Sequence, residues 1–190
     1  DCQMARFSYS NLNDAVLVDA DLSSTSFIEA DLVNADLDSA ILNSANLNYA
    51  NLNYANLNNT EMDSAYMNNA TLYGAHLVDA LLMRVYLVGA NLSYANLTDV
   101  NLLQTTLTDA NFEYANLNGG YLQGADIDGV NLQYAILTNA DFYNANLTGA
   151  YLQYANFTDA INTNQADFTD TSWYQTVWID GVAYDENQAD

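Results

Sequence analysis

The chain repeats every five residues, and this period constrains its fold more than any other feature. Residues 45–59 read ANLNYANLNYANLNN, in which Ala and Leu recur two residues apart in each pentad. An amphipathic helix repeats its apolar residues about every 3.6 positions, and a half-buried strand repeats them every 2. Neither period fits a repeat of five, so the repeat must be defined before secondary structure is assigned.

The repeat is continuous over most of the chain. If the Leu is taken as the centre of a pentad, 31 consecutive centres run from Phe7 to Phe157, and all are Leu, Phe, Met or Ile. Two residues before the centre, 23 of these 31 positions are Ala, and the others are small or β-branched. The remaining positions are rich in Asn, Asp, Ser and Thr, whose side chains bond to nearby backbone groups and favour turns. Each pentad is therefore predicted to be a very short strand followed by a turn.

One pentad cannot bury its own apolar face, but stacked pentads can, which is the principle of a solenoid. The pattern resembles the pentapeptide-repeat family, whose motif is A(D/N)LXX, and the resemblance covers about residues 2–178. It implies an all-β fold, a right-handed quadrilateral β-helix in which four pentads form one coil of about 20 residues. A chain of this length would form about eight to nine coils.

The five-residue frame slips once, near the C-terminus. The segment AINTNQADF at 160–168 contains one residue too many, and the frame resumes at Phe168, Trp173 and Trp178. We therefore expect one β-helical domain over residues 1–178, with a one-residue slip near 161–165. Residues 179–190 form an acidic tail that acts either as a cap or as a joint.

Tyrosine recurs at the second position after the centre. Five of these residues share one register when the chain is divided into coils of four pentads, and they are predicted to stack along one edge of the rod: Tyr54, Tyr94, Tyr114, Tyr134 and Tyr154. Aromatic neighbours on adjacent strands stabilise a sheet by roughly 0.2–1 kcal/mol each, which is one explanation. The other is a contact surface, because Tyr is enriched at protein interfaces.

A second candidate surface consists of apolar residues at positions that are usually polar. Met83 and Leu103 lie four pentads apart and should stack, and Tyr66 and Tyr86 form a similar pair nearby. An exposed apolar patch usually marks an interface, whereas ordinary drift of the repeat is the alternative explanation. The candidate residues are Val78, Leu81, Met83, Val88 and Leu103.

The charge of the chain argues against several classes of partner. It has 24 acidic and two basic residues, a net charge of −22, which argues against nucleic acid or an anionic membrane as a partner. No apolar run approaches the roughly 18 residues that a membrane span needs. One His and one Cys leave almost no scope for a catalytic triad or a zinc site. We therefore expect a protein without enzymatic activity and without a cofactor or metal.

The two ends of the rod are candidate contact sites. The repeat is in frame from residue 2, and an uncapped coil would present an unpaired strand edge that can pair with another chain. Cys2 occupies a centre position and is expected to be a small core residue of the first coil. At the other end, the bulky tryptophans could close the rod or join it to a neighbour. The candidate end contacts are Cys2, Phe7, Trp173 and Trp178.

Three functions remain open. The first is a structural rod that assembles with other copies of itself, as an end-to-end filament or a surface scaffold. The second follows from the resemblance: some pentapeptide-repeat proteins mimic duplex DNA and bind DNA gyrase, and this acidic rod could bind gyrase or another DNA-binding protein. The third is a module that binds an unidentified protein. The acidic surface, the scarcity of Lys and a first residue other than Met favour an extracellular or periplasmic location.

Overall fold

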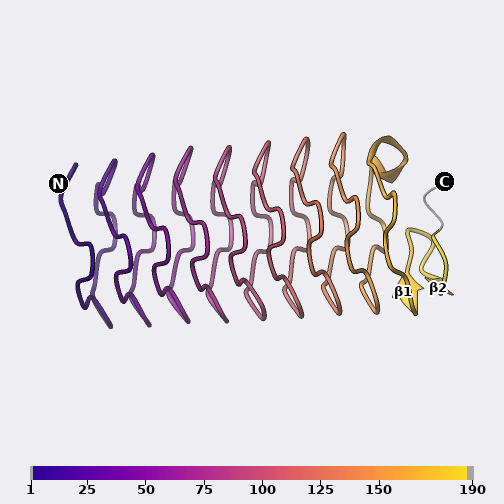
Figure 1. Cartoon of the computed structure of the whole chain (residues 1–190), viewed down its shortest axis with the longest axis horizontal. Coiled ribbons are helices and arrows are strands. Elements are labelled where there is room, and N and C mark those ends of the chain that lie inside the picture. Colours follow the sequence, from indigo (N-terminus) through magenta and orange to yellow (C-terminus); the bar gives the residue numbers. More distant parts are fainter. Residues whose placement is uncertain (1, 188–190) are drawn as a thin grey trace.

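The computed structural model describes residues 2–187. It is a solenoid of coils stacked along one axis, with the first coil and the strand β2 at opposite ends (Figure 1). Parallel bridges join each residue just before a centre to the equivalent residue four pentads further on, from Arg6 with Ser26 to Asp141 with Ile161. The coil of four pentads that the resemblance implies is therefore present in the fold.

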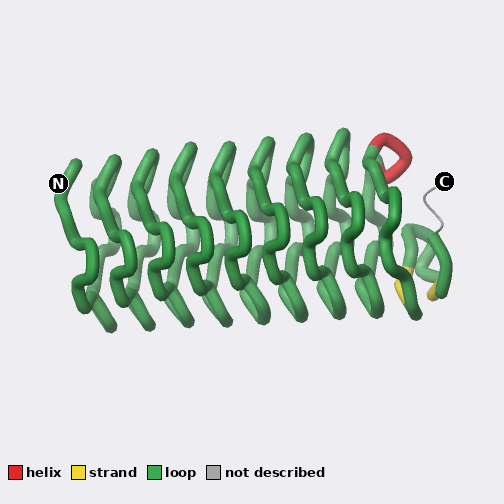
Figure 2. The backbone as a smooth tube through the Cα atoms, viewed as in Figure 1, coloured by secondary structure: helices red, strands yellow, loops and turns green. Residues whose placement is uncertain are grey.

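Regular secondary structure is sparse because each strand consists of one bridged residue. Within the described residues the elements are the 3-10 helix η1 (Thr163–Gln165) and the strands β1 (Thr176–Val177) and β2 (Ala183–Tyr184). The coils themselves therefore have the colour of loops and turns in Figure 2. Their repeated bridges nevertheless form parallel ladders along the sides of the rod.

The pentad at Leu47 illustrates how every repeat is built. The N–H of Leu47 donates to the carbonyl of Tyr66 in the next coil at 2.7 Å, and the N–H of Ala50 donates back to the carbonyl of Leu47 at 3.0 Å. The second bond closes a turn in which Tyr49 has φ of 62°. A positive φ at the third residue of a four-residue turn is typical of type II geometry. The chain therefore changes direction once in every pentad.

Asparagine side chains accept hydrogen bonds from backbone N–H groups, both within their own pentad and in the next coil. The side-chain oxygen of Asn46 accepts a hydrogen bond from the N–H of Asn48 at 3.1 Å, within the same pentad. The side-chain oxygen of Asn48 in turn accepts from the N–H of Asn68, one coil further on, at 2.8 Å. Since a buried N–H without a partner is costly, these bonds explain why the outward positions are so often Asn.

The core fills the bore of the coils with the centre residues and the small residues two positions before them. From Leu22 to Phe157 these side chains are almost fully buried, and the largest among them include Phe27, Phe112, Phe142 and Phe157. Burial of a side chain of this size contributes about 1.5–3 kcal/mol, so the continuous core is the main source of stability. The small residues allow the backbones on adjacent sides to approach closely.

The coil lengthens by one residue at η1. Asp141 is bridged to Ile161, four pentads later, whereas the bridge from Asn146 reaches Asp167, one residue beyond that spacing. The extra residue is accommodated by η1, which Asn162 precedes in the left-handed conformation with φ of 57°. The amide of Asn162 donates to the carboxylate of Asp141 at 2.7 Å, which ties this corner to the previous coil.

A short antiparallel hairpin covers the C-terminal end of the rod. Strand β1 is bridged to Asn156 on one side and pairs with β2 on the other, so that Thr176 faces Tyr184 and Val177 faces Ala183. Parallel stacking thus ends in an antiparallel pair. Residues 188–190 of the predicted tail lie outside the described residues.

The first coil is more exposed than expected. Cys2 was expected to be a small core residue, but its side chain is exposed. Its backbone nevertheless follows the repeat, because its N–H donates to the carbonyl of Asp21 at 2.9 Å. Phe7 is half-buried and stacks on Phe27 with ring centroids 5.4 Å apart. The expectation for Cys2 was wrong because no described residue packs on the outer side of this coil.

Candidate interaction surface

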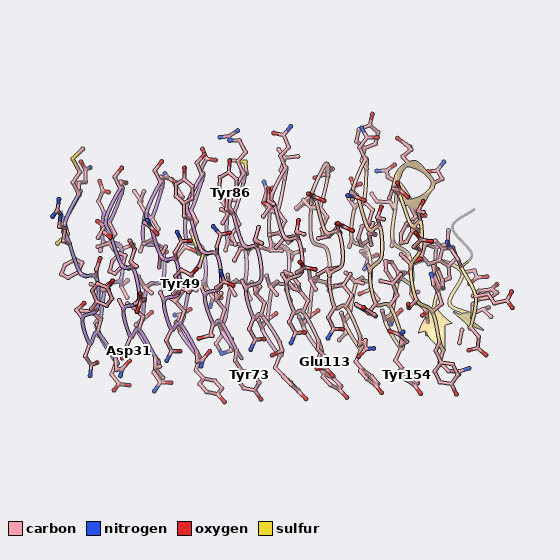
Figure 3. The ribbon with its side chains drawn as sticks, viewed as in Figure 1. Asp31, Tyr49, Tyr73, Tyr86, Glu113 and Tyr154 are labelled. Carbon is pink, nitrogen blue, oxygen red and sulfur yellow. The ribbon has the colours of Figure 1, made fainter. Side chains whose placement is uncertain are left out.

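Four of the five predicted tyrosines stack directly on one another along one edge of the rod, whereas the fifth, Tyr54, contacts Tyr73 edge-on. The rings of Tyr94 and Tyr114, of Tyr114 and Tyr134, and of Tyr134 and Tyr154 are stacked, with centroids 4.8, 4.5 and 4.6 Å apart. Side chains along this edge, Tyr73 and Tyr154 among them, point away from the rod at the lower margin of Figure 3. The stacking predicted for these four residues is therefore confirmed. The four residues keep between 39% and 52% of their surface exposed.

Two further tyrosines complete the stack, and the five-residue pattern alone did not identify them. Tyr73 lies between Tyr54 and Tyr94, with ring centroids 5.5 and 5.3 Å from theirs, and Tyr174 meets Tyr154 at 5.4 Å. Both sit one position earlier in the pentad than the other members. In the sequence, Gly74 could have indicated the place of Tyr73, because a glycine after Tyr73 leaves space for the ring of Tyr54. For Tyr174 the indication was the one-residue slip near 161–165, which puts Tyr174 directly after the centre Trp173.

The turn positions of the stacked tyrosines are unfavourable for a bulky residue. Tyr54, Tyr94, Tyr114, Tyr134 and Tyr154 all have φ between 60° and 62°. Gly, Asn and Asp occupy this left-handed region most readily, and most other positions of this kind in the chain carry small or polar residues. Ring stacking offsets part of the backbone cost. The same conformation occurs at Tyr9 and Tyr49 outside the stack, so the turn accepts tyrosine in either setting.

The environment of the stack changes the acidity of two phenols. Partial removal from water raises the pKa of Tyr114, and the neighbouring Tyr134, Tyr94 and Glu113 raise it further. The pKa of Tyr154 is also raised, first by the same partial removal from water and then by Tyr174. These two phenols are therefore held neutral over a wider range of pH than isolated tyrosines would be.

From residue 50 to residue 154, the side of the rod that carries the tyrosines is nearly uncharged, whereas the first two coils carry Asp14 and Asp31 on the same side. We call this side the tyrosine face, and it consists of residues 50–54, 70–74, 90–94, 110–114, 130–134 and 150–154. Between residues 50 and 154 the chain has nine acidic residues, and Glu113 is the one that lies in these six pentads. The other outward side chains of the tyrosine face are mainly Asn, Gln, Ser and Thr. The acidity of the protein is thus concentrated on its other sides.

The apolar residues at polar positions are spread over three sides of the coil. Leu81 and Met83 flank the centre Leu82, and Leu103 occupies the position of Met83 in the next coil. Val78 and Val88 belong to the pentads before and after Leu82, which lie on the two adjoining sides. Leu81 is 38% exposed and the other four are half-buried. The rings of Tyr66 and Tyr86 stack as predicted, with centroids 5.2 Å apart.

A shallow hollow lies on the side opposite the tyrosine face. It has a volume of about 190 Å³ and forms where Gly124 has no side chain between larger neighbours. Leu103 links the hollow to the apolar residues described above. The hollow is lined by Leu103, Gln104, Gln123, Gly124, Tyr143 and Asn144, none of which is acidic or basic.

The predicted end contacts differ from one another in accessibility. Cys2 is exposed and Phe7 is half-buried, whereas Trp173 and Trp178 are only 8% and 6% exposed. The two indole rings lie 4.9 Å apart, and Trp178 also packs on Phe157 at 5.2 Å. The tryptophans therefore belong to an aromatic cluster inside the C-terminal end. Their bulk closes this end of the bore rather than forming an outer surface.

Over residues 2–187, no group of three or more His, Cys, Asp or Glu side chains has the arrangement of a metal site. The acidic residues are spaced by the repeat and do not converge. The same part of the chain contains no helix long and apolar enough to cross a membrane. Arg84 pairs with Asp63 on the side of the coil opposite the tyrosine face.

Comparison with known proteins identifies the family. The family model described as pentapeptide repeats matches residues 1–38, 40–79, 86–124 and 125–161, in eight copies. The chain belongs to the pentapeptide-repeat family. No curated protein matches it.

Solved structures of other pentapeptide-repeat proteins resemble it. HetL from the cyanobacterium Nostoc, a pentapeptide-repeat protein involved in the regulation of heterocyst differentiation, is 30% identical, with a TM-score of 0.53. That alignment covers 95% of this chain and 81% of HetL. A trypsin-treated variant of QnrB1, a plasmid-mediated fluoroquinolone resistance protein, is 15% identical, with a TM-score of 0.52 over 90% of this chain and 91% of QnrB1. At this identity the second similarity shows the fold alone.

Proposed function

We propose that this pentapeptide-repeat protein is a non-enzymatic structural rod that assembles with other copies of itself. The observation that carries the proposal is the uninterrupted register, in which every bridge from Arg6 to Ile161 spans four pentads. Every outward position therefore recurs at the same rise, and two copies have surfaces with the same repeat. Contacts that are weak one by one can then add along the length of the rod.

We propose that the rod is a right-handed quadrilateral helix of about eight to nine coils. Such a helix is stiff because its backbone bonds and core run without a break. The hairpin of β1 and β2 covers the C-terminal end, which favours contacts through the long sides over an end-to-end filament. We place the role outside the cytoplasm, since a net charge of −22 with two basic residues suits a surface or secreted scaffold.

The test is the state of association of the full chain. Sedimentation velocity over a wide range of protein concentration, at low and at high salt, would show the assembled species directly. The proposal expects assembly to increase with salt, because salt screens the repulsion between copies that each carry a net charge of −22. Monomers at every concentration and every salt level would contradict it.

A second candidate function is supported by the distribution of charge. The later pentads of the side that precedes the tyrosine face carry acidic residues in several coils: Asp109, Asp126, Asp128, Asp167 and Asp170. An acidic stripe along a rod is the feature that a DNA mimic needs, because duplex DNA carries about one charge per 1.7 Å. Under this proposal the partner is DNA gyrase or another DNA-binding protein.

The second candidate has its own test. A gyrase supercoiling assay with increasing amounts of the protein would show inhibition, and high salt would weaken the binding because it acts between opposite charges. The salt dependence thus has the opposite sign from that of self-assembly. Unchanged supercoiling at micromolar protein would exclude gyrase as the partner.

A further inference from the structure

We propose that the tyrosine face is the surface through which two copies of this chain meet side by side. The inference rests on the proposed function and specifies its contact surface. It is carried by three observations: the form of the ring stack, the distribution of charge around it, and the repeat distance between its members.

The form of the stack determines what it can bind. In the central pairs the planes are nearly parallel, with 6° between Tyr114 and Tyr134 and 6° between Tyr134 and Tyr154. The rings therefore cover one another's flat faces and present their edges and hydroxyl groups outward. A sugar ring needs a free aromatic face to stack on, and the central rings do not offer one. A row of ring edges with hydroxyl groups suits contact with a protein surface.

The distribution of charge favours a second copy of this chain as the partner that binds the tyrosine face. Two molecules of charge −22 repel each other on most approaches, and least where both surfaces are neutral. The tyrosine face has one acidic residue in six pentads, Glu113, and Asp185 lies near its C-terminal end, so the face meets this condition over most of its length. Its Asn, Gln, Ser and Thr side chains can donate and accept hydrogen bonds, so the same surface is complementary to itself.

The repeat distance also favours a second copy. Successive rings are separated by 4.5 to 5.5 Å, close to the spacing between strands of a sheet. Another copy carries an identical row at an identical rise, so its rings stay in register over all coils in contact. A surface without this repeat would match the row at one or two positions only. Regular side-chain ladders that pack in this way are known from β-sheets stacked face to face.

The size of the surface predicts a weak contact. The row of seven rings contains six steps and is therefore about 30 Å long. One side of a coil is about 12 Å wide, so the tyrosine face has an area on the order of 400 Å² per copy. This is about half of the roughly 800 Å² per partner that a stable interface buries. We therefore expect a reversible dimer with a dissociation constant in the micromolar range or weaker, formed more readily as salt increases.

The experiment compares two variants that make the same change at the same turn position. Tyr114→Asp places a charge in the centre of the stack, whereas Tyr9→Asp places it in the first coil, where the residue is 72% exposed. Both positions have φ near 60°, where Asp is well tolerated. Sedimentation equilibrium of the wild-type chain and of both variants gives the dimer dissociation constants. Circular dichroism verifies that each variant is folded.

We expect Tyr114→Asp to raise the dissociation constant at least tenfold and Tyr9→Asp to change it less than twofold. If Tyr114→Asp is folded and dimerises as the wild type does, the contact surface lies elsewhere, and the inference is overturned while self-assembly stands. If Tyr9→Asp is the variant that weakens association, the contact is at the first coil, which also overturns the inference. A wild-type chain that remains monomeric contradicts the proposed function itself.

Discussion

The rings of Tyr114 and Tyr134 lie parallel, with centroids 4.5 Å apart and 6° between their planes. Each ring shields one flat face of the other from water, and the hydroxyl groups follow one another along the edge of the rod. Partial loss of water and the nearby phenols and Glu113 raise the pKa of Tyr114. We therefore expect this pair to make the stability of the rod depend on pH in the alkaline range.

The pKa of Tyr114 is higher in the folded state than in the unfolded state. The contribution of Tyr114 to stability is therefore fully present below the pKa of the unfolded state, about 10. It is lost as the pH rises through the folded-state pKa, because the folded state then binds more protons than the unfolded state. We expect the melting temperature of the wild-type chain to fall above about pH 10. Thermal unfolding followed by circular dichroism at stepwise pH measures this.

Tyr114→Phe is the control for the alkaline effect, since it keeps a ring in the stack and removes the group that titrates. The slope of melting temperature against pH should be smaller in this variant than in the wild-type chain. Equal slopes would show that the loss of stability arises outside the stack.

Gly74 is a position where a single methyl group should destabilise the fold. A Cβ at Gly74 would lie 2.8 Å from Cε1 of Tyr54, and its φ of +64° already disfavours a side chain. We expect Gly74→Ala to lower the free energy of unfolding by about 2–3 kcal/mol, from the backbone conformation and the displaced ring together. Urea denaturation measures the change.

Gly124→Ala is the matched control for Gly74. Gly124 has φ of +63°, but the nearest atom to its Cβ would be Cγ of Gln104 at 3.6 Å, an ordinary contact. Its cost should therefore be that of the backbone alone, about 1 kcal/mol. If the two variants lose the same stability, the ring of Tyr54 does not constrain Gly74.

The loss of stability caused by a core substitution should depend on the coil in which the substituted residue lies. Leu92 is fully buried between coils on both sides, whereas Leu12 in the first coil is half-buried. Leu92→Ala should lower the free energy of unfolding by about 2–5 kcal/mol, because it leaves a cavity in a core that cannot collapse around it. Leu12→Ala should cost about half as much or less. Equal costs in chemical denaturation would mean that the first coil is as tightly packed as the middle.

The C-terminal hairpin should lose its protection when the aromatic cluster is reduced. Trp178 packs on Trp173 and Phe157, and its backbone N–H donates to the carbonyl of Val182 at 2.9 Å. We expect Trp178→Ala to expose the backbone from Thr176 to Tyr184 to hydrogen exchange at least tenfold faster, while the central coils stay protected. Uniform acceleration along the chain would instead indicate that the rod unfolds as one unit.

The same hairpin should weaken in acid. The pKa of Asp180 is lowered by the hydrogen bonds that its carboxylate accepts, first from the N–H of Val182 and then from the hydroxyl of Tyr184. A lowered pKa means that this contribution is present above the unfolded value, about 3.9, and is lost as the pH falls through the folded-state pKa. The protection factors of the hairpin amides, which correct for the slower intrinsic exchange in acid, should fall below about pH 4, and Asp180→Asn should remove most of this pH dependence.

The sequence by itself determined the period and the core of this protein, and its resemblance to a known family implied the coil of four pentads. Residues such as Leu47 and Ala50 recur every five positions, and only a fold with one turn per pentad can bury all of them. The stacking of Tyr94, Tyr114, Tyr134 and Tyr154 also followed from the sequence, because side chains four pentads apart must lie above one another when a coil contains four pentads.

Only the tertiary structure decided the features that depend on space between coils. Tyr73 enters the stack because Gly74 leaves room beside Tyr54, a relationship that no single pentad contains. The exposure of Cys2 reverses what its position in the repeat suggested, and the burial of Trp178 is one of two outcomes that the sequence left open. A repeat specifies the contacts of each coil with its neighbours. The exposure of a residue at either end depends instead on which residues pack across that end, and only the folded chain determines this.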